Sequence, residues 1–340
     1  NFLSDPVFEV GAQVIASELD GILGDPTFGS YELLRLLGRG GAGLIFLARD
    51  RELERMAALK VLPAYLSDGD DRILRFRQEA QAASSISHPN VTSVYGFGKA
   101  NGRHYIAMEY VRGQTLRELL KAGDLNLLDA LDFAIQAARA LTAAHDLGII
   151  HRDVKPENLI IRDDRMLKVL DFGLAKQILQ SDLQIDHQLR TPSLVTETGH
   201  IMGTTSYMSP EQIRGKDLDL RTDIWSLGVV LYEMLAGARP FVGETPSDTQ
   251  AQILLSDPPP TPVFKAYPEL MRILNKMLDK DRLLRYDFAG TIIDDLEIVY
   301  REAQKRGENR QLSRFNGQSI KGPGMWTKIK GLFTSDSAGV

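Results

Sequence analysis

The feature that most constrains the fold is a change of sequence pattern near residue 110. Before it, short stretches typical of β-strands occur at 31–37, 44–48, 57–62, 91–97 and 104–108. One helical pattern, over 70–86, interrupts them, and beyond residue 110 the pattern is mostly helical. A small sheet-rich lobe followed by a larger helical lobe is an α+β arrangement. The cleft between two such lobes is a common place for a ligand.

Charge separates the two ends of the chain from the part between them. Residues 1–30 carry a net charge of −5 and no Lys or Arg, whereas residues 301–340 carry a net charge of +5. The basic end is also rich in Gly, Ser and Asn, which is typical of a flexible linker. We therefore expect an acidic extension, a globular domain over 31–300 with lobes at 31–108 and 112–300, and a flexible basic tail.

Composition excludes several classes of protein. The absence of cysteine excludes disulfides and thiolate-bound metals, and it suits the reducing cytoplasm. The overall net charge of −5 gives no reason to expect nucleic-acid binding. No apolar run reaches the roughly 18 residues that a membrane span needs. We expect a cytoplasmic protein with no nucleic-acid partner.

Three glycines, Gly38, Gly40 and Gly43, form the first motif of the predicted cleft. A dinucleotide-binding fold needs a helix directly after such glycines, but residues 44–48 resemble a strand. A Walker-type loop would need Gly-Lys-Ser/Thr, which is absent here. We interpret the glycines as a hairpin tip whose backbone N–H groups can lie close over phosphates, with a ligand-free turn as the alternative.

Lys60 lies at the end of an apolar strand, and Glu79 lies in the helical stretch that follows. A Lys60–Glu79 pair between strand and helix would hold the ammonium group where it can bind two phosphates. The alternative is a surface lysine whose aliphatic stem covers apolar neighbours.

The strongest signal is the run from His151 to Asn158, followed by Asp171 and the sequence Phe-Gly. A carboxylate at Asp153 can align an attacking hydroxyl group and accept its proton, and Lys155 can neutralise a transferred phosphoryl group. Asn158 and Asp171 offer the hard oxygen ligands that suit Mg²⁺, which bridges phosphates.

In their order and spacing these motifs resemble the eukaryotic-type (Hanks-type) serine/threonine protein kinases, in particular the bacterial members. The resemblance covers residues 31–300 and includes Ser209-Pro210-Glu211 and Arg285, which pairs with that glutamate in the family. It implies the two-lobed protein-kinase fold with an ATP cleft between the lobes. A lysine two positions after the catalytic aspartate is the serine/threonine-specific pattern.

The resemblance also implies a role for each matching residue. The catalytic residues would be Asp153, Lys155 and Lys60. Mg²⁺, with Mn²⁺ as an alternative, would be bound by Asn158 and Asp171. The nucleotide would be contacted by Leu37, Gly38, Gly40, Gly43, Ile45, Ala58, Lys60, Glu79, Met108, Glu109, Val111 and Ile160.

The implied reaction is transfer of the γ-phosphoryl group of ATP to serine or threonine hydroxyls of protein substrates. Bacterial members often carry two threonines before the conserved Gly-Thr, and here these are Thr196 and Thr198. We expect their autophosphorylation within the 174–202 activation loop, with Arg152 binding the phosphate and self-association bringing two copies together.

Both ends carry apolar residues that need an explanation. Residues 7–24 can form a short amphipathic helix that docks on the domain or on a second copy. The tail contains an amphiphilic stretch at 325–333 that would bind acidic lipid, with a membrane span beyond Val340. A tail without any partner is the alternative.

Two other classes of function stay open. A pseudokinase would bind partners without turning over ATP, which the intact Lys60, Asp153, Asn158 and Asp171 disfavour. A small-molecule phosphotransferase would use a similar fold, but such enzymes usually lack the Ser209–Glu211 segment and its Arg285 partner. Mg²⁺-dependent ATP turnover and a map of the phosphorylated residues separate these classes.

Overall fold

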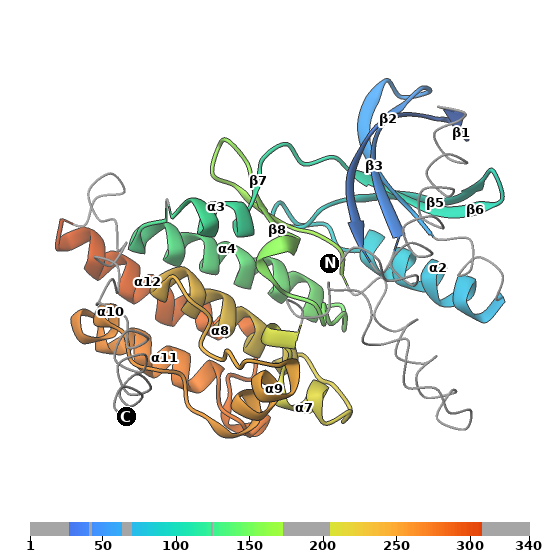
Figure 1. Ribbon diagram of the computed structural model, residues 1–340. Helices are drawn as coiled ribbons and strands as arrows, with labels where there is room; N and C mark the ends of the chain where they lie inside the picture. Colours follow the sequence, from blue (N-terminus) through green and yellow to red (C-terminus); the bar gives the residue numbers. More distant parts are fainter. Residues whose placement is uncertain (1–26, 41–42, 63–69, 124, 173–204, 308–340) are drawn as a thin grey trace, which may run out of the picture.

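Two lobes joined by one connecting segment make up the computed structural model (Figure 1). It describes residues 27–40, 43–62, 70–123, 125–172 and 205–307. The expected phosphorylation sites Thr196 and Thr198, and the apolar stretches 7–24 and 325–333, lie outside the described residues.

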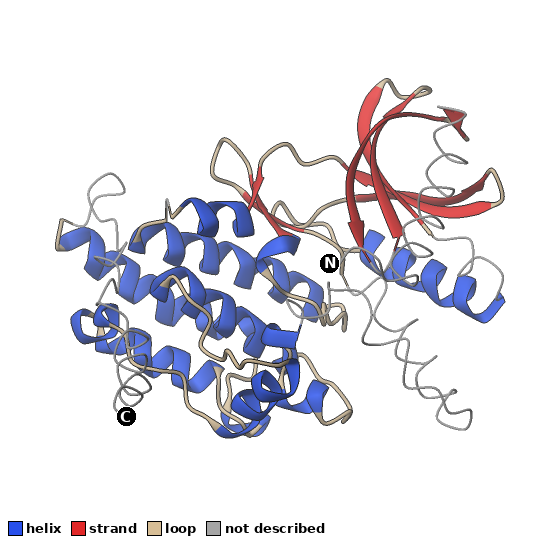
Figure 2. Cartoon of the chain, in the orientation of Figure 1, coloured by secondary structure: helices blue, strands red, loops and turns tan. Residues whose placement is uncertain are grey.

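The N-terminal lobe is an antiparallel sheet with strand order β1-β2-β3-β4-β6-β5 among the described residues. Figure 2 shows it as the red, strongly curved layer. Its core is apolar, with Phe28, Phe46 and Leu59 fully buried. The strands are β1 (Thr27–Phe28), β2 (Tyr31–Gly40), β3 (Gly43–Asp50), β4 (Arg55–Val61), β5 (Val94–Ala100) and β6 (Arg103–Glu109).

One helix, α2 (Asp70–Ser84), lies beside this sheet and contacts β5 (Figure 1). Ala80 and Ala83 are buried, as the three-residue spacing predicts for the face that packs inward. The helix ends two residues earlier than the expected range 70–86.

A second, small sheet with strand order β7-β8-β9 lies where the chain enters the C-terminal lobe (Figure 1). Its strands are β7 (Gln114–Thr115), β8 (Leu159–Ile161) and β9 (Leu167–Val169). Gly113 is required where the chain passes β8, because a Cβ atom there would lie 2.3 Å from the carbonyl oxygen of Ile161. The connection from β6 to β7 therefore runs directly against β8.

The C-terminal lobe is helical, and α8 lies at its centre. Nearly every residue of α8 is buried, and α4 and α11 pack against it, with α12 along α4 (Figure 1). Trp225 of α8 stacks on Phe241 at 5.7 Å between ring centroids. The elements are α3 (Leu116–Ala122), α4 (Leu127–His145), η2 (Pro156–Asn158), η5 (Thr205–Tyr207), α7 (Pro210–Ile213), α8 (Arg221–Ala236), α9 (Pro246–Leu255), α10 (Pro262–Ala266), α11 (Pro268–Met277), η6 (Arg282–Leu284) and α12 (Ala289–Lys305).

The arrangement agrees with the α+β, two-lobed fold expected from the sequence, and its element bounds differ in detail. Residues 91–93, expected to begin a strand, lie outside β5, because Val91 forms a bridge with Val169 of the small sheet. β1 and the last turn of α12 lie outside the expected 31–300 range. No helix within the described ranges is long and apolar enough to cross a membrane.

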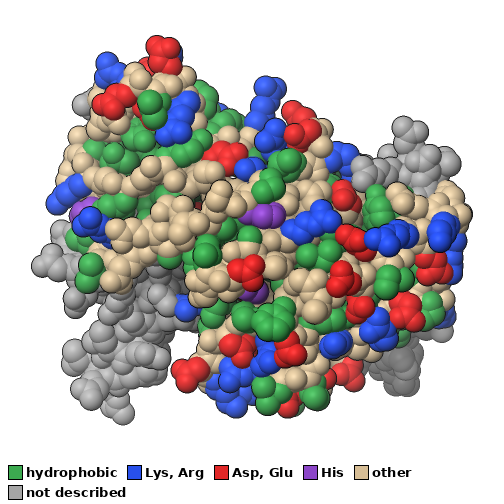
Figure 3. All heavy atoms as spheres, turned by 180° about the vertical axis from the view of Figure 1, so that it is seen from behind, with side chains coloured by type: hydrophobic (Ala, Val, Ile, Leu, Met, Phe, Trp, Pro, Cys, Tyr) green, Lys and Arg blue, Asp and Glu red, His purple; other side chains and the backbone are tan. Residues whose placement is uncertain are grey.

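Acidic and basic side chains lie interspersed over the face of the molecule seen in Figure 3. Ion pairs between exposed residues are common, such as Arg272 with Glu269 at 2.7 Å. Such pairs contribute little to stability, so the apolar interiors of the two lobes carry the fold.

Candidate active site

The glycine motif lies at the turn end of the β2–β3 hairpin, as the sequence predicts. Gly40 pairs with Gly43 across the turn, and Gly38 pairs with Ile45. Gly43 has φ of +122°, a backbone conformation that side-chain-bearing residues rarely adopt. Residues 41 and 42 lie outside the described ranges. At Gly38, Gly40 and Gly43, therefore, no side chain covers the backbone near the turn of the hairpin.

The next strand places Lys60 opposite Ile45, and Ala58 opposite Met108 of β6. Lys60 is almost fully buried, and its Nζ lies 2.9 Å from Oδ2 of Asp171. This ion pair joins β4 of the N-terminal lobe to the residue that follows the small sheet. Burying an ammonium group is costly, so a close carboxylate partner is expected.

Glu79 lies in α2, and its side chain is outside the described part of the structure. The predicted Lys60–Glu79 pair therefore stays a prediction. The described partner of Lys60 is Asp171.

Three predicted residues meet in the loop that ends in η2. Lys155 Nζ lies 2.7 Å from Asp153 Oδ2. The Asn158 amide nitrogen donates to the backbone carbonyl of Asp153 at 2.8 Å and to its Oδ2 at 3.2 Å. These contacts orient the Asp153 carboxylate, and they turn the amide oxygen of Asn158 away from it.

Asp171 lies next to this loop, because the Leu170 backbone N–H donates to the Asn158 carbonyl at 2.9 Å. The residue has φ of +50°, which is uncommon for a non-glycine residue. Its Oδ1 is buried and has no hydrogen-bond partner among the described residues. A buried carboxylate oxygen without a donor, one residue beyond the backbone bond to Asn158, fits a divalent cation that Asp171 and the amide oxygen of Asn158 would hold.

The loop from His151 to Asn158, which is the expected catalytic loop, is anchored by Asp223 at the start of α8. Oδ2 of Asp223 accepts the backbone N–H of His151 at 2.8 Å, and Oδ1 accepts that of Arg152 at 2.8 Å. His145 Nε2 lies 2.8 Å from the same Oδ2. Arg152 has φ of +65°, a conformation that the surrounding contacts must hold.

His151 connects the loop to Asp171. Its Nε2 lies 2.8 Å from the carbonyl oxygen of Leu170, and its ring lies 4.7 Å from that of Phe172. His151 is fully buried, and these contacts tie the loop to the residues on either side of Asp171.

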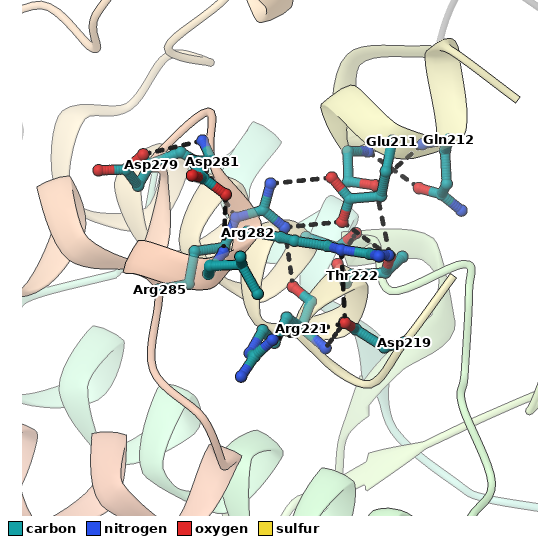
Figure 4. Close-up of polar contacts among 12 residues, drawn as sticks. Glu211, Gln212, Asp219, Arg221, Thr222, Asp279, Asp281, Arg282 and Arg285 are labelled. Carbon is teal, nitrogen blue, oxygen red and sulfur yellow. Dashed lines mark hydrogen bonds and ion pairs between the residues drawn. The ribbon is translucent and has the colours of Figure 1, made fainter. Parts of the chain in front are cut away.

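The segment at α7 is held by a buried bidentate ion pair (Figure 4). Arg285 donates from Nη1 and Nη2 to the two oxygens of Glu211 at 2.7 and 2.9 Å. Burial raises the pKa of the Glu211 carboxyl, but the Arg285 hydrogen bonds outweigh it and leave that pKa below its ordinary value. Beside this pair, Gln212 donates to the carbonyl of Arg152 at 2.9 Å and so ties α7 to the catalytic loop.

The residues expected to surround the adenine ring lie at the junction of the lobes. Leu37 and Ile45 pack against the apolar cluster that contains Ala58 and Met108. Glu109 ends β6, and Val111, which is buried, lies in the connection after it. Ile160 is half-buried in β8, opposite Thr115.

Comparison with known proteins identifies the fold. A model of the protein kinase domain matches residues 31–293. The chain belongs to the protein kinase family. Members of this family use ATP together with a divalent metal ion.

Named relatives of this kinase domain are bacterial. The chain is 41% identical over 277 residues to the serine/threonine-protein kinase PknB of Mycolicibacterium smegmatis, covering 79% of this chain and 43% of that protein. It is 38% identical over 275 residues to the probable serine/threonine-protein kinase CPE1738 of Clostridium perfringens, covering 80% and 38%. The chain thus spans about two fifths of the length of these relatives.

A solved structure agrees with the fold of this kinase domain. The crystal structure of the Mycobacterium tuberculosis PknI kinase domain is 26% identical, with a TM-score of 0.60 over 80% of this chain and 97% of that one. The expected bacterial serine/threonine kinase family and the expected two-lobed fold are both confirmed.

Several residues that shape the kinase site were not predicted to do so. Asp223 and Gln212 were not among the expected site residues. Lys168 was not singled out. The one available signal was chemical, since Asp223 lies in an otherwise largely apolar helix, where a carboxylate needs buried donors.

Proposed function

We propose that this kinase domain transfers the γ-phosphoryl group of Mg·ATP to serine and threonine hydroxyls of proteins. The observation that carries the proposal is the meeting of Lys60, from one lobe, with Asp171, beside the Asp153–Lys155–Asn158 cluster of the other. Positive charge, metal-binding oxygens and a base are the groups that phosphoryl transfer requires.

In this proposal Asp153 aligns the substrate hydroxyl and accepts its proton as that oxygen bonds to the γ-phosphorus. The bond from the γ-phosphorus to the bridging oxygen breaks, and ADP leaves. Lys155 offers positive charge to the transferred group, and Lys60 to the remaining phosphates. Asn158 and Asp171 would hold a Mg²⁺ ion, which would supply charge neutralisation at the phosphates.

The test is a map of phosphorylated residues. The purified chain is incubated with Mg·ATP and a generic protein substrate, and both are analysed by mass spectrometry. We expect phosphoserine and phosphothreonine on the added protein. Nucleotide binding without transfer would favour the pseudokinase alternative, and phosphorylation confined to small molecules would favour the phosphotransferase alternative.

Regulation by autophosphorylation extends the proposal. Thr196 and Thr198 would carry the phosphates, one copy would modify another, and Arg152 is the expected cation because it directly precedes Asp153. A phosphate adds about −1.5 to −2 charges, which arginine can bind. The double variant Thr196→Ala/Thr198→Ala should then lose most of its activity toward an added substrate, and unchanged activity would contradict this regulation.

The place of action proposed is the cytoplasm, with tethering to the inner face of a membrane by a segment beyond residue 340. The support is the basic tail, whose residues 321–333 combine cations with aromatic side chains. Salt-dependent co-sedimentation with acidic vesicles by the full chain, and not by a chain ending at Arg306, is expected. Equal and negligible binding by both would contradict it.

A further inference from the structure

We propose that Lys168 is a positioning residue that fixes the hinge, the segment 109–111 expected to bind adenine, to β9, the strand that leads to Asp171. Lys168 lies in β9, three residues before Asp171. Its Nζ lies 2.9 Å from Oε2 of Glu109, the last residue of β6, and donates to the carbonyl of Val91 at 3.2 Å. The inference rests on the proposed function, because it concerns how the nucleotide site is built.

Burial distinguishes this ion pair from the many surface pairs of the molecule. The Lys168 side chain is 9% exposed and that of Glu109 is 21% exposed. A charge in such surroundings is costly when unpaired, so the two groups hold each other in place. Surface pairs such as Arg139–Glu297, with 48% and 31% exposed side chains, do not have this constraint.

The Lys168–Glu109 pair spans three neighbouring chain segments, which are β9, residues 90–93 and the end of β6. The segment 90–93 lies between β9 and the hinge. On one side, the Val169 N–H donates to the Asn90 carbonyl at 2.8 Å, and the Thr92 N–H to the Val169 carbonyl at 3.0 Å. On the other side, the Glu109 N–H donates to the Ser93 carbonyl at 2.8 Å. The Lys168 side chain spans these segments from β9 to Glu109.

The consequence is a direct link between the two parts of the nucleotide site. Glu109 begins the segment expected to bind adenine, and Asp171 belongs to the expected metal site. Removal of the Lys168 ammonium leaves the Glu109 carboxylate half-buried without its cation. The hinge then moves to bring that carboxylate to water, and the affinity for the base falls.

The test compares Lys168→Met, Glu109→Gln, the double variant Lys168→Met/Glu109→Gln, and Lys168→Arg with the wild type. Adenosine, which has no phosphate, probes the hinge alone in a binding titration. Steady-state kinetics with ATP then separate KM from kcat. Arg139→Met, which breaks the exposed pair with Glu297, is the matched control for loss of a cation.

We expect Lys168→Met to weaken adenosine binding and raise the KM for ATP about tenfold, while kcat changes by less than about threefold. Lys168→Arg should bind adenosine almost as the wild type does. The double variant should recover most of the lost affinity, because neither charge is then left alone. Arg139→Met should bind adenosine like the wild type.

Wild-type adenosine affinity in Lys168→Met, whatever its melting temperature, would overturn the positioning role. So would a double variant as impaired as Lys168→Met. If Lys168→Met does not fold, Glu109→Gln is used in the same assay, since it leaves the Lys168 ammonium without its carboxylate. Weaker adenosine binding by Glu109→Gln is then expected, and wild-type affinity would overturn the positioning role. A wild type that binds neither adenosine nor ATP would instead contradict the proposed function itself.

Discussion

At the scale of single residues, the catalytic loop depends on the buried carboxylate of Asp223. This side chain is fully buried and accepts two backbone N–H groups of the loop. Asp223→Asn places an amide N–H₂ group against these donors, so we expect a loss of about 2–4 kcal/mol in the free energy of unfolding. We also expect more than a tenfold loss in kcat, because Arg152 is no longer held at positive φ.

The matched control is Asp164→Asn, at an exposed turn between β8 and β9. Its free energy of unfolding should change by less than about 1 kcal/mol. Urea unfolding and kcat are measured for both variants. Equal effects of the two substitutions would show that Asp223 has no special role.

The residue scale also shows what sequence could reveal about the site. Asp153, Lys155, Asn158 and Asp171 were predicted because phosphoryl transfer needs these chemical groups at close spacing. A carboxylate in a largely apolar helix indicates that Asp223 needs buried donors, but their identity was not predictable, because they are backbone N–H groups, which no side-chain pattern reveals. The Lys168–Glu109 pair was hidden for another reason, since 59 residues separate its members.

At the scale of elements, the close contact of α8 with α11 depends on Gly228. A Cβ atom there would lie 2.9 Å from Cβ of Met277 and 3.0 Å from Cδ2 of Leu278. Gly228→Ala should therefore force the helices apart and lower the free energy of unfolding by about 1–3 kcal/mol.

Gly290→Ala is the control for this helix contact, because its Cβ would meet Thr142 at an ordinary 3.7 Å. Alanine is the better helix former, so this variant should be neutral or more stable by up to about 1 kcal/mol. Chemical denaturation measures both. A Gly228→Ala protein as stable as Gly290→Ala would contradict the packing account.

The Glu211–Arg285 pair, which fixes α7 to the segment after η6, should appear in the pH dependence of stability. The pKa of Glu211 is lowered in the folded state, so its stabilisation is complete above the unfolded pKa near 4.5. It is lost as the pH falls through the lower, folded pKa. The stability difference between wild type and Glu211→Gln should be about 3–5 kcal/mol at pH 7 and should shrink below about pH 4.5.

The control for this pH prediction is Glu269→Gln, at an exposed pair with Arg272. Its stability relative to the wild type should stay nearly constant with pH. Urea denaturation at a series of pH values measures all three proteins. A Glu211→Gln difference that does not change with pH would contradict the assigned pKa direction.

Element types were easier to predict than element bounds. The short apolar run at 57–62 marks β4, which is buried on both faces, and the stripe of apolar residues at three- and four-residue steps marks α4. The start of β5 was placed too early, because the apolar Val91 was assigned to this strand. Val91 instead forms a bridge with Val169 in the other sheet. Such long-range pairing leaves no local period.

At the scale of the whole molecule, the two lobes meet through Lys60 and Asp171, so nucleotide and metal should stabilise the chain together. Mg²⁺ added to saturating ADP should raise the melting temperature of the wild type, because ligands that bind only the folded state stabilise it. In Asp171→Asn the increment from Mg²⁺ should vanish while that from ADP alone persists. Thermal-shift assays with and without EDTA measure both, and an unchanged Mg²⁺ increment would remove Asp171 from the metal site.

The most direct test of the central claim is phosphoryl transfer by Asp153→Asn to an added protein substrate. The account predicts a fall in kcat of roughly 10² to 10⁴-fold, the usual contribution of a catalytic base, with the ADP-induced thermal shift intact. Asp146→Asn, at an exposed position after α4, should transfer phosphate at the wild-type rate. Near-wild-type phosphorylation by Asp153→Asn would contradict the assignment of the catalytic site.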